Sequence, residues 1–118
     1  MTTTMLRNHT PHPVTVVLVD GSDVDLPPHP PSPRVVVERS EDGELRTEHG
    51  AVALTRTRRS AEVVDLPAAE SGVVLIVSLA VAQARPDRTD LVFPDRQIRD
   101  ADGRIVACAA LGRVSVRH

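Results

Sequence analysis

The chain has 118 residues, of which 41% are apolar and 25% charged, and its formal net charge is −2 at neutral pH. This length and composition are typical of one globular domain, so we expect a single domain over residues 1–118 and exclude a disordered chain. The weak net charge and the single aromatic residue, Phe93, argue against nucleic-acid binding, which depends on basic surfaces and base stacking.

The N-terminal part predicts one hairpin followed by a stiff connection. Residues 1–7 have no apolar run typical of a signal peptide and are expected to form a flexible leader. β-Branched residues predict strands over 14–19 and 24–26, joined by a type I′ turn at Asp20-Gly21. Residues 27–33 include five prolines, which favours a surface connection in polyproline II conformation. The alternative for this segment is a ligand for a proline-recognising domain.

The middle of the chain predicts four more short strands. They cover residues 34–39, 44–48, 51–56 and 61–66. The second Asp-Gly pair, Asp42-Gly43, predicts a hairpin turn between the first two, and Gly50 separates the second from the third. The basic run from Arg56 to Arg59 is interpreted as a solvated turn, with a phosphate site as the alternative.

A central strand and a helix are expected next. Residues 72–78 are apolar at nearly every position, which indicates a strand that is covered on both faces. Residues 79–84 favour a short helix, with Ser78 as its N-cap and Pro86 as its stop. The apolar run over 72–82 is shorter than the ~20 residues of a membrane-spanning helix, so no membrane association is expected.

The C-terminal part predicts an extended piece over 90–94 and a last hairpin. Strands over 96–99 and 104–109 flank the third Asp-Gly pair, Asp102-Gly103, and Val114 with Val116 could add an edge strand. The single cysteine, Cys108, excludes an internal disulfide and is expected to be a small buried apolar residue. A free cysteine suits a reducing compartment, so we expect a cytoplasmic protein. The whole pattern predicts a mainly β fold, a small antiparallel barrel or sandwich of about eight short strands with one short helix.

No catalytic or metal-binding motif is present. His9 and His12 are too few for a zinc site, which needs three or four ligands. No Gly-x-Ser-x-Gly or glycine-rich phosphate loop occurs, and the segment from Asp100 to Gly103 lacks the ligand pattern of a calcium loop. We therefore expect no metal, no cofactor and no catalytic residue.

Arginine and aspartate alternate densely between residues 85 and 104. Mutual ion pairing in a solvated loop is the simpler interpretation. The alternative is a ring of charges at one end of the barrel that binds a small anionic ligand, because the guanidinium group suits carboxylate and phosphate. The candidate ligand-binding residues, including two from the N-terminal cluster, are Asn8, His12, Arg88, Asp90, Arg96, Arg99 and Asp100.

One motif carries a resemblance to a known family. The segment Asn8-x-Thr10-Pro11-His12-Pro13-Val14 resembles the Asn-Leu-Thr-Pro-His-Pro-Val opening of small bacterial proteins that are common in actinobacteria and similar to some phage-encoded proteins. Further similar pieces are Val64-Asp65-Leu66-Pro67, Ile76-Val77-Ser78, Arg88-x-Asp90-Leu91 and Arg99-Asp100-x-x-Gly103-Arg104-Ile105-Val106. The resemblance covers most of the chain, which departs from the family at His9, where leucine is usual. The family is uncharacterised, so the resemblance implies no activity and no catalytic residue.

Three functions remain open at the level of sequence. We favour a non-enzymatic β domain that binds a ligand or a protein partner, and valine-rich strand edges make a second copy of the chain one such partner. The alternatives are a small hydrolase or transferase that uses His12 with the Asp/Arg-rich segment, and a protein that sequesters a small anionic nucleotide. Protein binding predicts an exposed apolar patch or an available sheet edge. Ligand binding is expected near the last hairpin, with the His12 loop as its neighbour.

Overall fold

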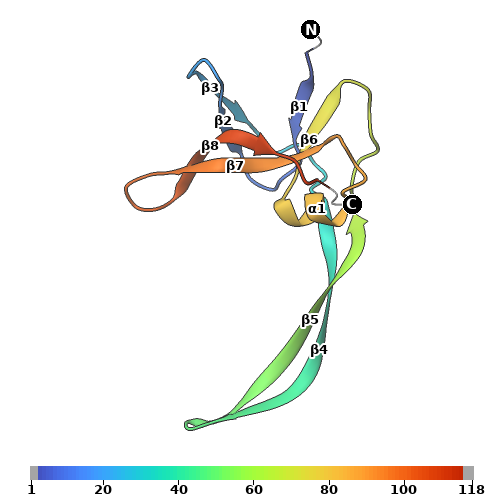
Figure 1. Cartoon of the computed structure of the whole chain (residues 1–118), viewed down its shortest axis with the longest axis vertical. Helices are drawn as coiled ribbons and strands as arrows, with labels where there is room; N and C mark the ends of the chain where they lie inside the picture. The colour runs from blue at the N-terminus through green and yellow to red at the C-terminus, as the bar shows by residue number, and fades with distance from the viewer. Residues whose placement is uncertain (1–2, 116–118) are drawn as a thin grey trace.

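The computed structural model of the chain describes residues 3–115 and shows a barrel-like body from which a long two-stranded arm extends (Figure 1). Strand accounts for 55% of the structure and helix for 5%, so the predicted mainly β fold is confirmed. The body is a nearly closed six-stranded sheet with the order β1-β6-β7-β8-β2-β3, and the arm is the separate pair β4-β5. The body strands are β1 (Met5–Asn8), β2 (Val14–Val17), β3 (Asp23–Leu26), β6 (Val73–Ile76), β7 (Leu91–Arg99) and β8 (Ile105–Gly112).

The sheet of the body is mixed rather than antiparallel throughout. Strands β6 and β1, β6 and β7, and β2 and β8 run parallel. Among the described residues, the antiparallel pairs of the body are the hairpins β2–β3 and β7–β8. The parallel step from β6 to β7 needs a crossover connection, which the chain supplies with helix α1 (Leu79–Ala84).

The core forms around β6 and α1, as the apolar pattern predicts. Ile76 and Val77 are fully buried, and Val81 of α1 is 1% exposed. The helix begins where expected, because the Ser78 hydroxyl accepts a hydrogen bond from the Val81 N–H at 3.3 Å. It ends at Ala84, just before Pro86.

Two of the three Asp-Gly pairs lie in wider loops than predicted. The first connects β2 to β3 through residues 18–22, and the third connects β7 to β8 through residues 100–104. Gly21 and Gly103 have positive φ angles of 90° and 80°, whereas neither preceding aspartate does. The predicted type I′ turns are therefore wrong, because that turn needs positive φ at both central residues.

The arm replaces the four short strands predicted for the middle of the chain. Strand β4 (Arg34–Thr47) pairs antiparallel with β5 (Gly50–Val64), and the hairpin turn lies at Glu48 and His49. The prediction of a turn at Asp42-Gly43 is wrong, since these residues lie inside β4, where the register shifts. Gly43 has a φ of 82°, which is the conformation that a glycine adopts in a β-bulge as well as in a turn. The predicted turn over 56–59 is wrong too, because these residues continue β5.

Only the base of the arm contacts the core. Val35 and Val63 pack against the buried cluster of the body, together with Leu66. The remaining length extends into solvent and gives the molecule dimensions of 61 × 37 × 32 Å (Figure 1). The radius of gyration is 18.1 Å, compared with about 13.5 Å for a compact chain of this length.

The segments near the chain ends differ from the sequence-based predictions, whereas the proline-rich segment agrees with them. Residues 5–7 are not a flexible leader, because they form β1 and pair with β6. Val114 packs on the core outside any strand, and Val116 lies outside the described residues. Residues 27–33 form neither helix nor strand, as predicted. Within residues 3–115, no helix has the length and apolar character needed to cross a membrane.

Candidate functional site

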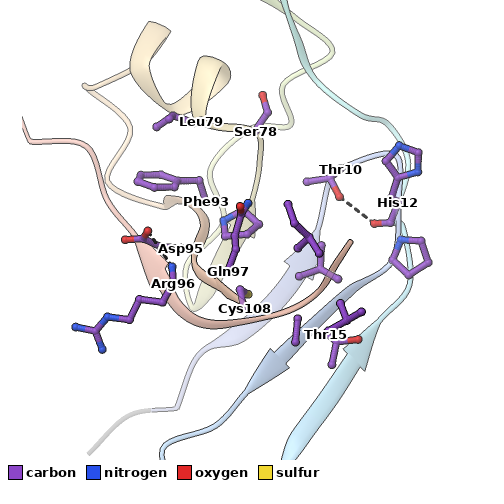
Figure 2. Close-up of a pocket in the computed structure, with 16 residues that line it drawn as sticks. Thr10, His12, Thr15, Ser78, Leu79, Phe93, Asp95, Arg96, Gln97 and Cys108 are labelled. Carbon is purple, nitrogen blue, oxygen red and sulfur yellow. Dashed lines mark hydrogen bonds between the residues drawn. The ribbon is translucent and has the colours of Figure 1, made fainter. Parts of the chain in front are cut away.

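A cavity of about 670 Å³ opens between the His12 loop and the β7–β8 hairpin (Figure 2). This is the region in which the sequence predicts a binding site. Its apolar lining residues are Pro13, Val14, Leu79, Phe93, Pro94, Ile105, Val106, Ala107 and Cys108. Its polar lining residues are Thr10, His12, Thr15, Ser78, Asp95, Arg96 and Gln97. The volume is in the range of small-molecule sites, and the lining is mainly apolar with few charges.

The His12 loop is held by the buried side chain of Asn8, which is 1% exposed. Its amide group donates to the backbone carbonyl of His12 at 2.8 Å and to that of Leu26 at 2.9 Å. Its oxygen accepts from the Thr10 N–H at 3.0 Å and from the Thr10 hydroxyl at 2.6 Å. Asn8, a predicted ligand-binding residue, therefore has its hydrogen-bonding groups occupied within the protein and acts as a structural residue that supports the His12 loop.

The neighbouring His9 is also buried, with 3% exposure. Its Nδ1 lies 2.8 Å from the carbonyl oxygen of Pro31, which can only accept, so this nitrogen carries the proton of the bond. Its Nε2 is buried without a hydrogen-bond partner, and its ring meets that of His29 edge to face at 5.0 Å. Together with a bond from the His29 N–H to the Asn8 carbonyl, these contacts fasten the proline-rich segment to the body.

Strand β7 forms another wall of the cavity and has an unusual backbone at Arg96. The φ angle of Arg96 is 49°, in the left-handed region that residues other than glycine rarely adopt. The Asp95 carboxylate accepts a hydrogen bond from the Arg96 N–H at 2.9 Å. Figure 2 shows that the Arg96 side chain extends outward, away from Thr15 and Cys108. Arg96 thus lies at the rim of the cavity and does not cover its floor.

Phe93, the only aromatic residue, lies across Gly112 on the neighbouring strand. The two residues are register partners, and a Cβ atom on Gly112 would come within 2.6 Å of the Phe93 Cε2 atom. Only glycine leaves room for the ring in this position, so this pair shapes the apolar side of the cavity.

The serine and the cysteine that line the cavity are not arranged as nucleophiles. The Ser78 hydroxyl caps α1. Cys108 is 2% exposed, and burial raises the pKa of its thiol, which disfavours the reactive thiolate. Among residues 3–115, no hydrogen bond joins the His12 ring to a carboxylate or to Ser78.

The other predicted ligand-binding residues lie away from the cavity. Arg88 and Asp90 form a two-point ion pair at 2.7 and 2.8 Å, and Arg88 also donates to the Pro67 carbonyl at 2.9 Å. The bonds from Arg88 hold the pKa of Asp90 below its ordinary value. These contacts join the loop before β7 to the loop after β5, so this pair is structural.

Arg99 and Asp100 stabilise the loop between β7 and β8. Arg99 donates to the Gly103 carbonyl at 2.8 Å, and the Asp100 carboxylate accepts from the backbone N–H groups of Asp102 and Arg104. Of the seven predicted residues, the structure brings only His12 and Arg96 to the cavity lining. The sequence analysis missed the apolar lining, because Leu79, Phe93 and Val106 have the pattern of ordinary core residues.

The arm presents a second candidate surface, which the sequence analysis also missed. Leu45 pairs with Val52 across the strands, and Leu54 follows Val52 by two residues, so all three side chains share one face. Their exposed fractions are 51%, 54% and 37%. We call this set the arm cluster. The two-residue turn at Glu48 and His49 sets this register, in which Thr47 lies opposite Gly50 and Leu45 opposite Val52.

Charged and polar residues continue the face of the arm cluster toward the body. Arg56 pairs with Ser40, and Arg58 pairs with Glu38. Arg56 also lies 3.3 Å from the Asp42 carboxylate. The opposite face instead combines small residues such as Ala51 and Ala53 with charged partners. An apolar centre bordered by charges is typical of protein–protein interfaces.

Comparisons of this chain with protein-family models, curated proteins and solved structures give no match. The resemblance of the Asn8–Val14 segment to an actinobacterial family therefore stays a prediction, and no role is transferred from it. Within residues 3–115, no group of three or more potential ligand side chains could hold a metal ion. The function is inferred from the cavity and the arm alone.

Proposed function

We propose that this protein is a non-enzymatic protein-binding module in which the arm is the docking element. The observation that carries the proposal is the arm itself, a hairpin of 14- and 15-residue strands that contacts the body only at its base and exposes the arm cluster. An isolated two-stranded hairpin is at best marginally stable in water, so a partner surface would be expected to cover it.

The accessible area supports the same conclusion. The chain exposes 8858 Å², whereas a monomeric protein of 12.7 kDa exposes about 6,200 Å². The excess is about 2,600 Å², which exceeds the ~800 Å² that each partner contributes to a standard protein interface. A chain that functions alone has no physical reason to keep so much additional surface in water.

The two alternatives from the sequence receive less support. A hydrolase needs a base next to a nucleophile or a water, and the Ser78 and Cys108 arrangements described above do not provide it. An anion-sequestering protein needs free arginines in its cavity. Arg85 and Arg88 are bound to Asp87 and Asp90, and Arg96 is the one arginine among the described lining residues.

A photo-crosslinking amino acid placed at Val52 in the producing cell tests the proposal. We expect one discrete crosslinked protein product from position 52 and none from position 57, which lies on the opposite face of the same strand. Equal labelling from both positions, or no product from either, would contradict docking through this face.

A second candidate function is the binding of a small, uncharged ligand with an apolar face. The observation in its favour is that the cavity is walled by Phe93, the chain's only Phe, Tyr or Trp residue, and bordered by uncharged groups such as Thr10, Ser78 and Gln97. Thermal-shift screening of uncharged heterocycles tests it. A stabilising compound should lose its effect in Phe93→Leu, and an equal effect in that variant would contradict binding in the cavity.

A further inference from the structure

We infer that the surface docked on the arm is a second copy of this chain, so that the protein is a homodimer joined through the faces that carry Leu45, Val52 and Leu54. This inference rests on the proposed function, because it identifies the partner of the same surface. It adds that the arm is covered whenever the protein is present at sufficient concentration, without any other component.

The area agrees with a self-association of this kind. Two chains together carry an excess of about 5,200 Å² over two compact monomers. Obligate homodimers bury about 2,000 to 5,000 Å² in total. Burial of most of both arms would therefore return each chain to the exposure of an ordinary folded protein. A small docking partner that touched only the tip of the arm would leave most of the excess in water.

The charges of the arm make it complementary to itself. On the face of the arm cluster, β4 carries Glu38 and Ser40, whereas β5 carries Arg58 and Arg56 opposite them. Two arms that pack face to face with their tips at the same end place β4 of one chain over β5 of the other, by the geometry of a two-fold axis along the arm. The arginines on β5 of one chain then face Glu38 on β4 of the other, with the two arm clusters in the same interface.

Sedimentation equilibrium of the purified full chain tests the inference, with three proteins measured side by side. The test variant carries Leu45→Thr, Val52→Thr and Leu54→Thr, since threonine keeps a high β-propensity on an exposed strand. The control variant carries Ala51→Thr, Ala53→Thr and Thr57→Ser on the opposite face of β5. Circular dichroism and the melting temperature of the body confirm that each variant is folded, because the substitutions lie far from the core.

We expect a dimer in the wild type and in the control variant. In the test variant, the dissociation constant of the dimer should be at least about 100-fold higher. A wild-type chain that stays monomeric up to about 0.2 mM, about two hundred times a typical micromolar Kd, would overturn the inference, as would a dimer that the test variant leaves unchanged. The proposed function fails separately. If the chain is monomeric but still crosslinks from Val52 to a different protein, the homodimer is contradicted and the docking function stands. If the chain is monomeric and gives no crosslink, both are contradicted.

Discussion

Leu45 lies directly opposite Val52 near the end of the arm, and both side chains are about half exposed. The turn at Glu48 and His49 fixes this pairing, and Leu54 shares the face because it follows Val52 by two residues. Three exposed apolar side chains on a solvated hairpin are unfavourable in isolation. Their arrangement on one face supports the proposal that another protein covers this surface.

Replacing Asn8 by alanine should strongly destabilise the fold. The Asn8 side chain makes four hydrogen bonds in a buried position, and its loss leaves the carbonyls of His12 and Leu26 without these donors. We expect a decrease of about 3 kcal/mol in the free energy of unfolding. Urea denaturation measures it, and a decrease below about 1 kcal/mol would contradict the structural role that we assign to Asn8.

Replacing His9 by leucine should have a much smaller effect, although His9 is equally buried. The substitution removes a hydrogen bond to the Pro31 carbonyl and, at the same time, the Nε2 atom that has no partner. These two contributions oppose each other, so the unfolding free energy should change by less than about 1 kcal/mol. The same urea experiment measures both variants, and an equal loss in His9→Leu and Asn8→Ala would show that the His9 contacts are stronger than we infer.

Gly112 should not tolerate a side chain. A Cβ atom there overlaps the ring of Phe93, so Gly112→Ala must displace the ring at a cost of about 2 kcal/mol. Thermal unfolding measures this cost. Combining Gly112→Ala with Phe93→Leu should cost less than the sum of the two single substitutions, because the smaller side chain removes the overlap. Strict additivity of the two would mean that the ring and the glycine are not in contact.

The Arg88–Asp90 pair should make stability depend on pH in the acidic range. The pKa of Asp90 is lower in the folded state than its ordinary value, so the pair stabilises the fold above the unfolded pKa of about 3.9. This contribution is lost as the pH falls through the folded-state value. Asp90→Asn should therefore be about 1 to 2 kcal/mol less stable than the wild type at pH 7, and this difference should shrink as the pH falls from about 4 to about 2. A difference that stays constant over this range would exclude the ion pair as its cause.

Local signals in the sequence predicted those parts of the fold that depend on neighbouring residues. The cap at Ser78, the stop at Pro86 and the covered strand before them follow from side-chain chemistry over a few positions. The error at Asp42-Gly43 has a physical reason, because glycine with positive φ serves both a turn and a bulge. Parallel pairing of β6 with β1 and β7 joins distant segments and leaves no local signal.

The sequence predicted the location of the candidate site better than the residues that line it. The last hairpin and the His12 loop do border the cavity. Most of the predicted polar residues instead form hydrogen bonds or ion pairs outside it. Arg88 and Asp90 are two residues apart and form an ion pair with each other. The alternation of Arg and Asp in the sequence is the same whether such residues pair with each other or bind a ligand together.

The arm cluster could not be predicted, because it depends on a turn at Glu48 and His49 instead of the expected turn at Asp42-Gly43. It also depends on exposure of the arm, which no local pattern in the sequence indicates.

Amide hydrogen exchange along the arm tests the central claim most directly. If a partner surface covers the arm, the amides around Leu45, Val52 and Leu54 should exchange slowly, and their protection should increase with protein concentration. The same amides should exchange rapidly in the variant with threonine at all three positions, while the core amides of Ile76 and Val77 stay protected in both proteins. Rapid exchange along the wild-type arm at every concentration, in the purified protein and with the host cell extract added, would contradict the claim that this arm is a docking surface.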